Sequence, residues 1–159
     1  MEREVFPKLA EEGKLYGHLV NGLWMDIGKP EEYLETNKII LDSLVDTIKQ
    51  KRAKNFEVKS PVAFDKGVSI AEKSVIGPYA ILGENVTVGK NTKISNSVIF
   101  PNVEIGDFAS IDGALIGEGA RIGKNVKISG GCIIGDHAKI KDNLHLSNVH
   151  TVCPAKEVS

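Results

Sequence analysis

His145 and His150 are separated by a spacing that could suit a zinc ion. Zinc binds imidazole nitrogens, and a zinc site needs three or more protein ligands that converge on one point. Two further histidines, His18 and His137, are candidates for the general base of an acyl transfer. Where these side chains point therefore decides what chemistry they can do.

Asp26 is a second candidate, because it lies within the distinctive string GLWMDIGKPEEY at residues 22–33. Magnesium binds one or two carboxylates together with phosphate oxygens and water, so this Asp could serve phosphate chemistry. On a strand, Asp26 would share a face with Trp24. A lone Asp at the end of a strand also commonly closes a turn or caps a helix. The residues alone leave both roles open.

The composition bears on several classes of function. The 159 residues carry a formal charge of −1, which gives no electrostatic basis for binding nucleic acid or an acidic membrane. No apolar run approaches the length of a membrane span, and no signal peptide follows Met1, so we expect a cytoplasmic protein. Cys132 and Cys153 form neither a disulfide framework nor a metal pair. The basic run KQKRAK at 49–54 could bind phosphate, but we interpret it as a solvated helix end and linker.

A six-residue repeat runs from Phe56 to Val152 and provides the elements that must position these residues. Bulky apolar residues recur along it, and fourteen of the sixteen steps between them are six residues long. One short strand and one tight bend per hexad predict a parallel β-helix over residues 56–159. The bulky positions are Val58, Phe64, Ile70, Ile76, Leu82, Val88, Ile94, Ile99, Ile105, Ile111, Ile116, Ile122, Ile128, Ile134, Ile140, Leu146 and Val152.

The repeat predicts the direction of individual side chains. The bulky residues should point inward and stack on their counterparts one coil away. A mostly small residue two positions earlier should also point inward, and this set includes Cys132 and His150. His137 should lie on an exposed turn. Two five-residue steps, which end at Ile99 and Ile116, should tighten a corner without changing the inward register.

Residues 1–55 lack the hexad and form a second unit. We expect a helix over Glu2–Glu12, strands over Leu15–Val20 and Leu23–Ile27 joined by an Asn-Gly hairpin turn, and a long helix from Pro30 through Ile48. This unit is too small to build its own core. It must pack on the solenoid, or it is the edge of a larger domain.

The hexad resembles that of the hexapeptide-repeat proteins, which implies a left-handed β-helix with three hexads per coil and between five and six coils. The string at 22–33, with EREVFP at residues 2–7 and Asn37-Lys38, resembles the end of the catalytic domain in sugar-1-phosphate nucleotidyltransferases, most closely the mannose-1-phosphate guanylyltransferase branch. The expected fold is then mainly β, with a small α+β remnant of the α/β catalytic domain at residues 1–55.

This resemblance implies a reaction in which a nucleoside triphosphate and a sugar 1-phosphate give a nucleotide sugar and pyrophosphate. It assigns Asp26 as one of two carboxylates that hold the catalytic Mg²⁺. The Gly-rich nucleotide loop of the family, its second metal Asp and its base-recognition residues are absent. We therefore expect this chain alone to be non-catalytic, with no complete catalytic or nucleotide-binding site.

Three alternative functions are open. A γ-class carbonic anhydrase is disfavoured because His145 and His150 are out of register for a shared zinc, with no third His about two coils earlier. An acyltransferase would need a loop to cover its coenzyme, and none is evident. A stand-alone structural or interaction module is compatible with the family assignment. In either case we expect a homo-oligomer formed through the solenoid.

Overall fold

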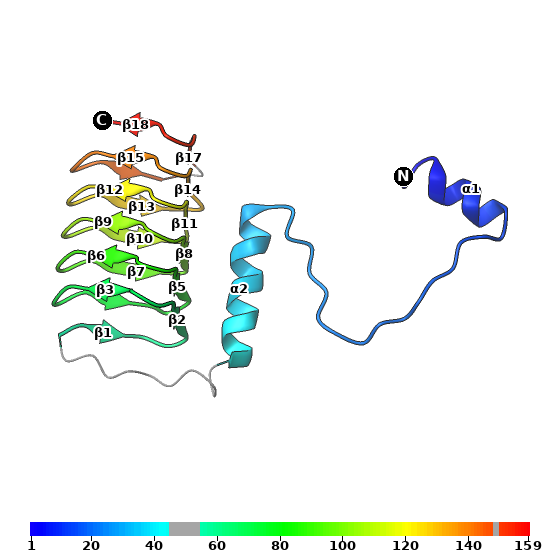
Figure 1. The fold of residues 1–159 in the computed structure, drawn as a ribbon, viewed down its shortest axis with the longest axis horizontal. Helices are drawn as coiled ribbons and strands as arrows, with labels where there is room; N and C mark the ends of the chain where they lie inside the picture. Colours follow the sequence, from blue (N-terminus) through cyan, green and yellow to red (C-terminus); the bar gives the residue numbers. More distant parts are fainter. Residues whose placement is uncertain (45–54, 148–149) are drawn as a thin grey trace.

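The hexads fold as predicted into a left-handed parallel β-helix (Figure 1). The structure is a computed structural model and describes residues 1–44, 55–147 and 150–159. Each coil contributes one strand to each of three sheets, and every strand pairs in parallel with the strand three positions along the chain. The three six-stranded sheets make six coils, at the upper end of the predicted number.

The strands are two or three residues long, and those of each sheet stack along the column in chain order. Sheet A contains β1 (Glu57–Val58), β4 (Val75–Ile76), β7 (Lys93–Ser95), β10 (Ser110–Asp112), β13 (Lys127–Ser129) and β16 (His145–Leu146). Sheet B contains β2 (Val62–Phe64), β5 (Ala80–Leu82), β8 (Ser97–Ile99), β11 (Leu115–Ile116), β14 (Ile133–Ile134) and β17 (Thr151–Val152). Sheet C contains β3 (Ser69–Ile70), β6 (Thr87–Val88), β9 (Glu104–Ile105), β12 (Arg121–Ile122), β15 (Lys139–Ile140) and β18 (Glu157–Val158).

The bulky hexad positions form the core, as the repeat predicts. From Ile76 to Val152 every one of them is buried. The small positions between them are buried as well, and the polar ones form hydrogen bonds: the Ser74 hydroxyl donates to the Gly89 carbonyl at 2.8 Å. Cys132 is fully buried and Cys153 is exposed, both as free thiols.

The two five-residue steps keep the register through a single left-handed residue. Asn96, with φ of 48°, joins β7 to β8, and Gly113, with φ of 67°, takes the same place one coil later. Asn and Gly enter this backbone region at low cost. Beyond the shortened corners the inward residues still pair in register, Ile99 with Leu82 and Ile116 with Ile134.

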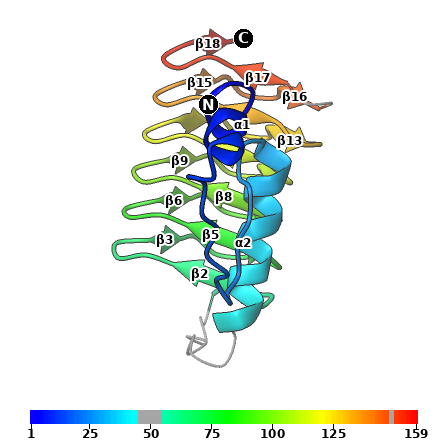
Figure 2. The ribbon, with the colours of Figure 1, turned by 90° about the vertical axis from the view of Figure 1, so that its right-hand side faces the viewer.

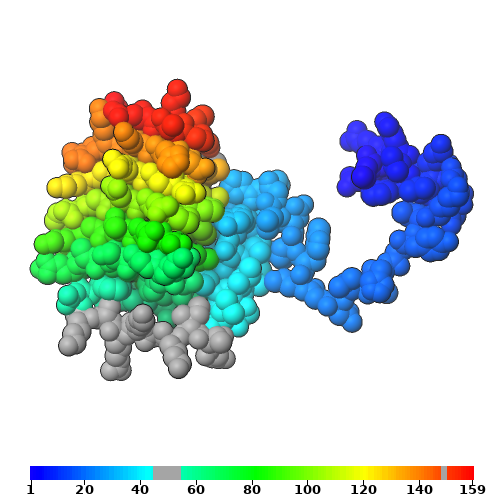
Figure 3. Space-filling view, in the orientation of Figure 1, coloured from blue at the N-terminus to red at the C-terminus, as the bar shows by residue number. Residues whose placement is uncertain are grey.

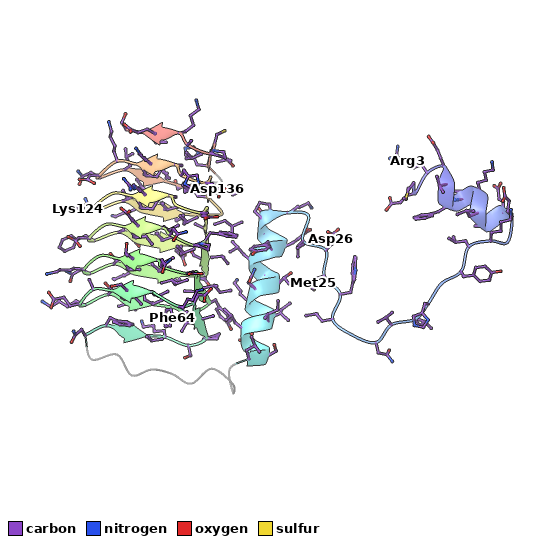
Figure 4. The ribbon with its side chains drawn as sticks, in the orientation of Figure 1. Arg3, Met25, Asp26, Phe64, Lys124 and Asp136 are labelled. Carbon is purple, nitrogen blue, oxygen red and sulfur yellow. The ribbon has the colours of Figure 1, made fainter. Side chains whose placement is uncertain are left out.

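Two inward predictions are wrong, and both concern the ends of the column. Phe64 is 39% exposed although it pairs in register with the buried Leu82. It lies on β2, the first strand of sheet B, so no coil packs beneath it (Figure 4). His150 is exposed before β17, the last strand of the same sheet. The repeat specifies direction, and both exceptions lie on terminal strands or corners of the column, where a neighbouring strand lies on one side only.

The amino-terminal segment differs more from expectation. Helix α1 (Val5–Glu11) is shorter than predicted and buries none of its residues. The hairpin is wrong, because residues 14–29 contain no strand. An isolated two-stranded hairpin is at best marginally stable in water, and no third strand or covering helix lies beside it in the described part of the chain. Residues 1–29 extend away from the solenoid (Figure 3).

Helix α2 (Pro30–Leu44) begins where predicted; its predicted end at Ile48 and the basic run 49–54 lie outside the described residues. It lies against the outer face of sheet B in two perpendicular views (Figures 1 and 2). The outward residues of that sheet form an apolar row, and Val98 within it is only 6% exposed. On the helix, Leu41 is 2% exposed. Packing on the solenoid, one of the two expected outcomes, therefore holds for α2.

Polar contacts fix α2 to the same sheet. The Lys38 ammonium lies 5.9 Å from the centre of the Tyr79 ring, a cation–π distance. The Asp42 carboxylate lies beside the Tyr79 hydroxyl and accepts its hydrogen bond, which raises the pKa of Tyr79 above its ordinary value of 10.0. The negative charge of Asp42 is the larger cause, because it opposes formation of the phenolate.

This contact should be sensitive to alkaline pH. Folding raises the pKa of Tyr79, so the contact between Tyr79 and Asp42 contributes fully to the free energy of unfolding below pH 10. This contribution is lost as the pH rises through the folded-state pKa. We expect Asp42→Asn to lower the pKa of Tyr79 towards 10.0, as followed by ultraviolet titration with Tyr79→Phe as the reference. Identical titration curves for the wild type and Asp42→Asn would contradict this assignment.

Candidate functional site

Asp26 lies in the exposed stretch that leads into α2 (Figure 4). Its Oδ1 accepts a hydrogen bond from the Gly28 backbone N–H at 3.1 Å, which closes a local turn. The Lys29 backbone N–H then donates to Glu32 Oε2 at 3.1 Å, and Pro30 is the first residue of the helix. The string DIGKPEE thus encodes a turn and a helix start. Asp26 serves the turn with one carboxylate oxygen while its side chain stays open to solvent.

The surroundings of Asp26 do not complete a metal site. Magnesium needs several oxygen ligands, and one exposed carboxylate supplies only part of such a set. In residues 1–44, 55–147 and 150–159, no three His, Cys, Asp or Glu side chains gather closely enough to hold a metal ion. The residues therefore suit a contribution to a magnesium site but not the whole of it, and the metal role of Asp26 stays a prediction.

The histidines do not form a site in the described part of the chain. His145 is exposed on β16 in sheet A, whereas His150 is exposed ahead of β17 in sheet B. His137 lies on an exposed corner with φ of 56°, as predicted, and His18 is exposed in the extended segment. The placement of these residues gives no support to a zinc enzyme or to an acyl-transfer base.

Two surface hollows of the solenoid could hold a ligand. The larger, about 450 Å³, lies on sheet C, where Glu104, Arg121, Lys139 and Glu157 form a row. Arg121 pairs with Glu104 at 3.4 Å, and Lys141 pairs with Glu157 at 2.9 Å. The hydrogen bond from Lys141, together with its charge, lowers the pKa of Glu157. The two basic residues lie between the two acidic ones, so the row carries no net charge and does not favour a ligand of either sign.

The smaller hollow, about 220 Å³, lies on sheet B. It is lined mainly by apolar side chains, including Phe100, Leu115, Ile133 and Pro154. Asp136 is the one carboxylate of the lining, and its Oδ1 accepts a hydrogen bond from the Glu118 backbone N–H at 2.9 Å. The carboxylate thus serves a corner of the coil. Apart from Asp136, no Ser, Cys, His, Lys, Asp or Glu among the described residues lines the hollow.

Most of the exposed large apolar side chains among the described residues lie ahead of and along α2. The large apolar residues before α2 that are exposed are Met1, Val5, Phe6, Leu15, Tyr16, Leu19, Val20, Leu23, Trp24 and Ile27. Leu19 is 97% exposed and Trp24 is 82% exposed, values that are unusual for side chains of this size. The arrangement is one carboxylate suited to a metal beside a large exposed apolar surface. Neither the carboxylate nor the apolar surface forms a complete site within the described residues.

Comparison with known proteins gives a family match over the solenoid and relatives that align with nearly the whole chain. The family profile of the GMPPB C-terminal domain matches residues 58–159. Mannose-1-phosphate guanylyltransferase 1 of Arabidopsis thaliana is 30% identical over 158 residues, which are 99% of this chain and 44% of the relative. Mannose-1-phosphate guanyltransferase of Candida albicans is 32% identical over 160 residues, or 100% of this chain and 44% of the relative. The chain thus spans less than half the length of these relatives.

Among solved structures, the acetyltransferase domain of PglB from Neisseria gonorrhoeae is 16% identical, with 92% of this chain and 88% of that chain covered. Its TM-score is 0.36, which is too low to support an inference about function. In the described residues, no helix is long and apolar enough to span a membrane.

Proposed function

The chain belongs to the GMPPB C-terminal domain family, and from this premise we propose that it is the carboxy-terminal portion of a sugar-1-phosphate nucleotidyltransferase. The reaction would join a nucleoside triphosphate to a sugar 1-phosphate and release pyrophosphate. Mannose 1-phosphate and GTP are the proposed substrates, because the relatives are named mannose-1-phosphate guanylyltransferases.

One observation carries this proposal. The family profile begins at residue 58, yet the Arabidopsis relative aligns over 99% of the chain. Residues 1–57 therefore correspond to a part of the relative that precedes its C-terminal domain. That part of the chain carries Asp26 and the exposed apolar side chains. These residues are best explained as the end of a catalytic domain, with the domain boundary near residue 55.

Asp26 would act through its carboxylate at the junction with the rest of the catalytic domain. The turn closed by the Gly28 N–H fixes Oδ1, so the carboxylate is oriented before any ligand binds. When bound, Mg²⁺ would neutralise charge on the attacking and leaving phosphate oxygens. The second carboxylate, the nucleotide loop and the base-recognition residues would come from outside this chain. We accordingly propose that the chain alone is non-catalytic.

The solenoid would have a structural role in the enzyme. We propose that it supports homo-oligomer formation or regulation of a cytoplasmic enzyme, because it folds around its own continuous core and none of its exposed groups forms a catalytic cluster in the described residues. Light scattering of the purified chain at micromolar concentration tests the oligomeric part of this proposal, and a monomer would contradict it.

Activity of the chain alone and of a chimera tests the function. The purified chain, given GTP, mannose 1-phosphate and Mg²⁺, is expected to form no GDP-mannose above the protein-free blank. The chimera joins the region of the Arabidopsis relative that precedes the aligned segment to Met1 of this chain. It is expected to form GDP-mannose. Product from the chain alone would refute the non-catalytic proposal, and an inactive but folded chimera would count against the family reaction.

A further inference from the structure

Helix α2 has a second apolar face besides the one that packs on the solenoid. Tyr33, Ile40 and Leu44 recur at helical spacing and define what we call the flank stripe. With 3.6 residues per turn, Ile40 lies about 100° around the helix from the buried Leu41. Ile40 and Leu44 are each 42% exposed, whereas Leu41 is 2% exposed. The solenoid therefore covers one apolar face of α2 and leaves the other largely open.

The inner face of α2 is held firmly. Leu41 packs against the solenoid, Lys38 lies over the Tyr79 ring, and Asp42 interacts with the Tyr79 hydroxyl. These contacts come from positions 38, 41 and 42, on the side of the helix away from Ile40. The flank stripe is thus presented on a helix whose orientation is already fixed.

The residues that precede α2 extend this open apolar surface. Leu23 is 64% exposed and Ile27 is 54% exposed, immediately before the first turn of the helix. Scattered exposed apolar residues are ordinary on a protein surface, but here they are concentrated in the chain that leads into α2 and in α2 itself. Residues 23–44 therefore present a segment that a partner can bury without changing the solenoid.

We propose that the flank stripe of α2 is the docking surface for the rest of the catalytic domain, the part that precedes the aligned segment in the relatives. This inference rests on the proposed function. We name that partner because the chain spans 44% of the relative, and because residues 1–57 of the chain align with the part of the relative before the C-terminal domain. Helix α2 then lies between the two domains, with Leu41 on the solenoid and Ile40 and Leu44 on the catalytic domain.

This arrangement makes α2 a rigid connection between the domains. If α2 were bound on one face only, the rest of the catalytic domain would be joined to it through the extended residues 14–29 alone. A helix buried on two faces fixes the position of the catalytic domain against sheet B. The position of Asp26, four residues before Pro30, would then be set relative to both domains by the same helix.

Hydrogen exchange of α2 in the chimera tests the docking. Amide exchange of a helix slows when a partner suppresses its local opening. The α2 amides are expected to exchange at least tenfold more slowly in the chimera than in the isolated chain. The double substitution Ile40→Lys with Leu44→Lys is expected to remove most of that difference. Both residues are half exposed, so the isolated chain should keep its thermal midpoint to within about 3 °C.

Phe108→Asn is the matched control. Phe108 is 59% exposed on a distant corner of the solenoid and has φ of 61°, which Asn adopts readily. This variant should retain the slow exchange of α2. Equal exchange of α2 in the wild-type chimera and in the chimera with both lysines would overturn the docking proposal even if GDP-mannose is made. Slow exchange that depends on Ile40 and Leu44 in an inactive chimera would support docking and contradict the proposed reaction.

Discussion

Replacement of Ile116 by Ala is expected to lower the free energy of unfolding by about 3 kcal/mol, within the range of about 2–5 kcal/mol for truncation of a buried Ile. The Ile116 side chain is fully buried, and it pairs in register with Ile99 on one side and Ile134 on the other. Truncation removes apolar burial and leaves a cavity between two coils that are held apart by their own backbone hydrogen bonds. Such a site cannot collapse easily, so the cavity cost remains.

Urea unfolding followed by circular dichroism measures this loss. Leu115→Ala is the matched control, because Leu115 is the preceding residue, points outward and is only half buried. Its loss should be less than half that of Ile116→Ala. Since each coil of a solenoid contacts only its neighbours, the substitution should also weaken the cooperativity between the coils on either side. Equal losses for the two variants would show that the hexad does not define the inward face.

The hexad predicts the solenoid well because its information is local and repeated. The position of each bulky residue in the hexad predicts that its side chain points inward, and the same residue type recurs above and below it. The prediction fails at Phe64 and His150, which lie at the two ends of the column. The predicted hairpin at residues 15–27 fails for a related reason. Its alternating apolar residues require a covering surface that the described chain does not supply.

The candidate site is only partly predictable from the sequence. The Asp-Ile-Gly-Lys-Pro spacing predicts the turn and helix start that the structure has at Asp26. Its metal role is a prediction from the resemblance alone, because a single exposed carboxylate does not make a magnesium site. The helical pattern does not reveal the flank stripe, because it places Ile40 and Leu41 on one face. Consecutive residues lie about 100° apart on any helix, so only the exposures in the structure, 2% for Leu41 and 42% for Ile40, separate the covered side from the open one.

Asp26→Asn in the chimera is expected to lower kcat by about two to three orders of magnitude. A metal ligand that stabilises several kcal/mol of developing charge corresponds to a loss of this size, at about 1.36 kcal/mol per factor of ten. Asn keeps an oxygen in the place of Oδ1, so it can still accept the hydrogen bond from the Gly28 N–H. The substitution therefore removes the charge and keeps the turn.

Asp26→Ala distinguishes the two roles of this residue. If Asp26 binds Mg²⁺, Asn and Ala should lower kcat to a similar extent, and both should require more Mg²⁺ for half-maximal rate. If Asp26 only closes the turn, Asn should retain nearly full activity and Ala alone should lose it, since only Ala lacks an acceptor for the Gly28 N–H. Steady-state rates across a magnesium series decide between these outcomes. Because the turn immediately precedes α2, circular dichroism of each variant will show whether the helix start has been kept.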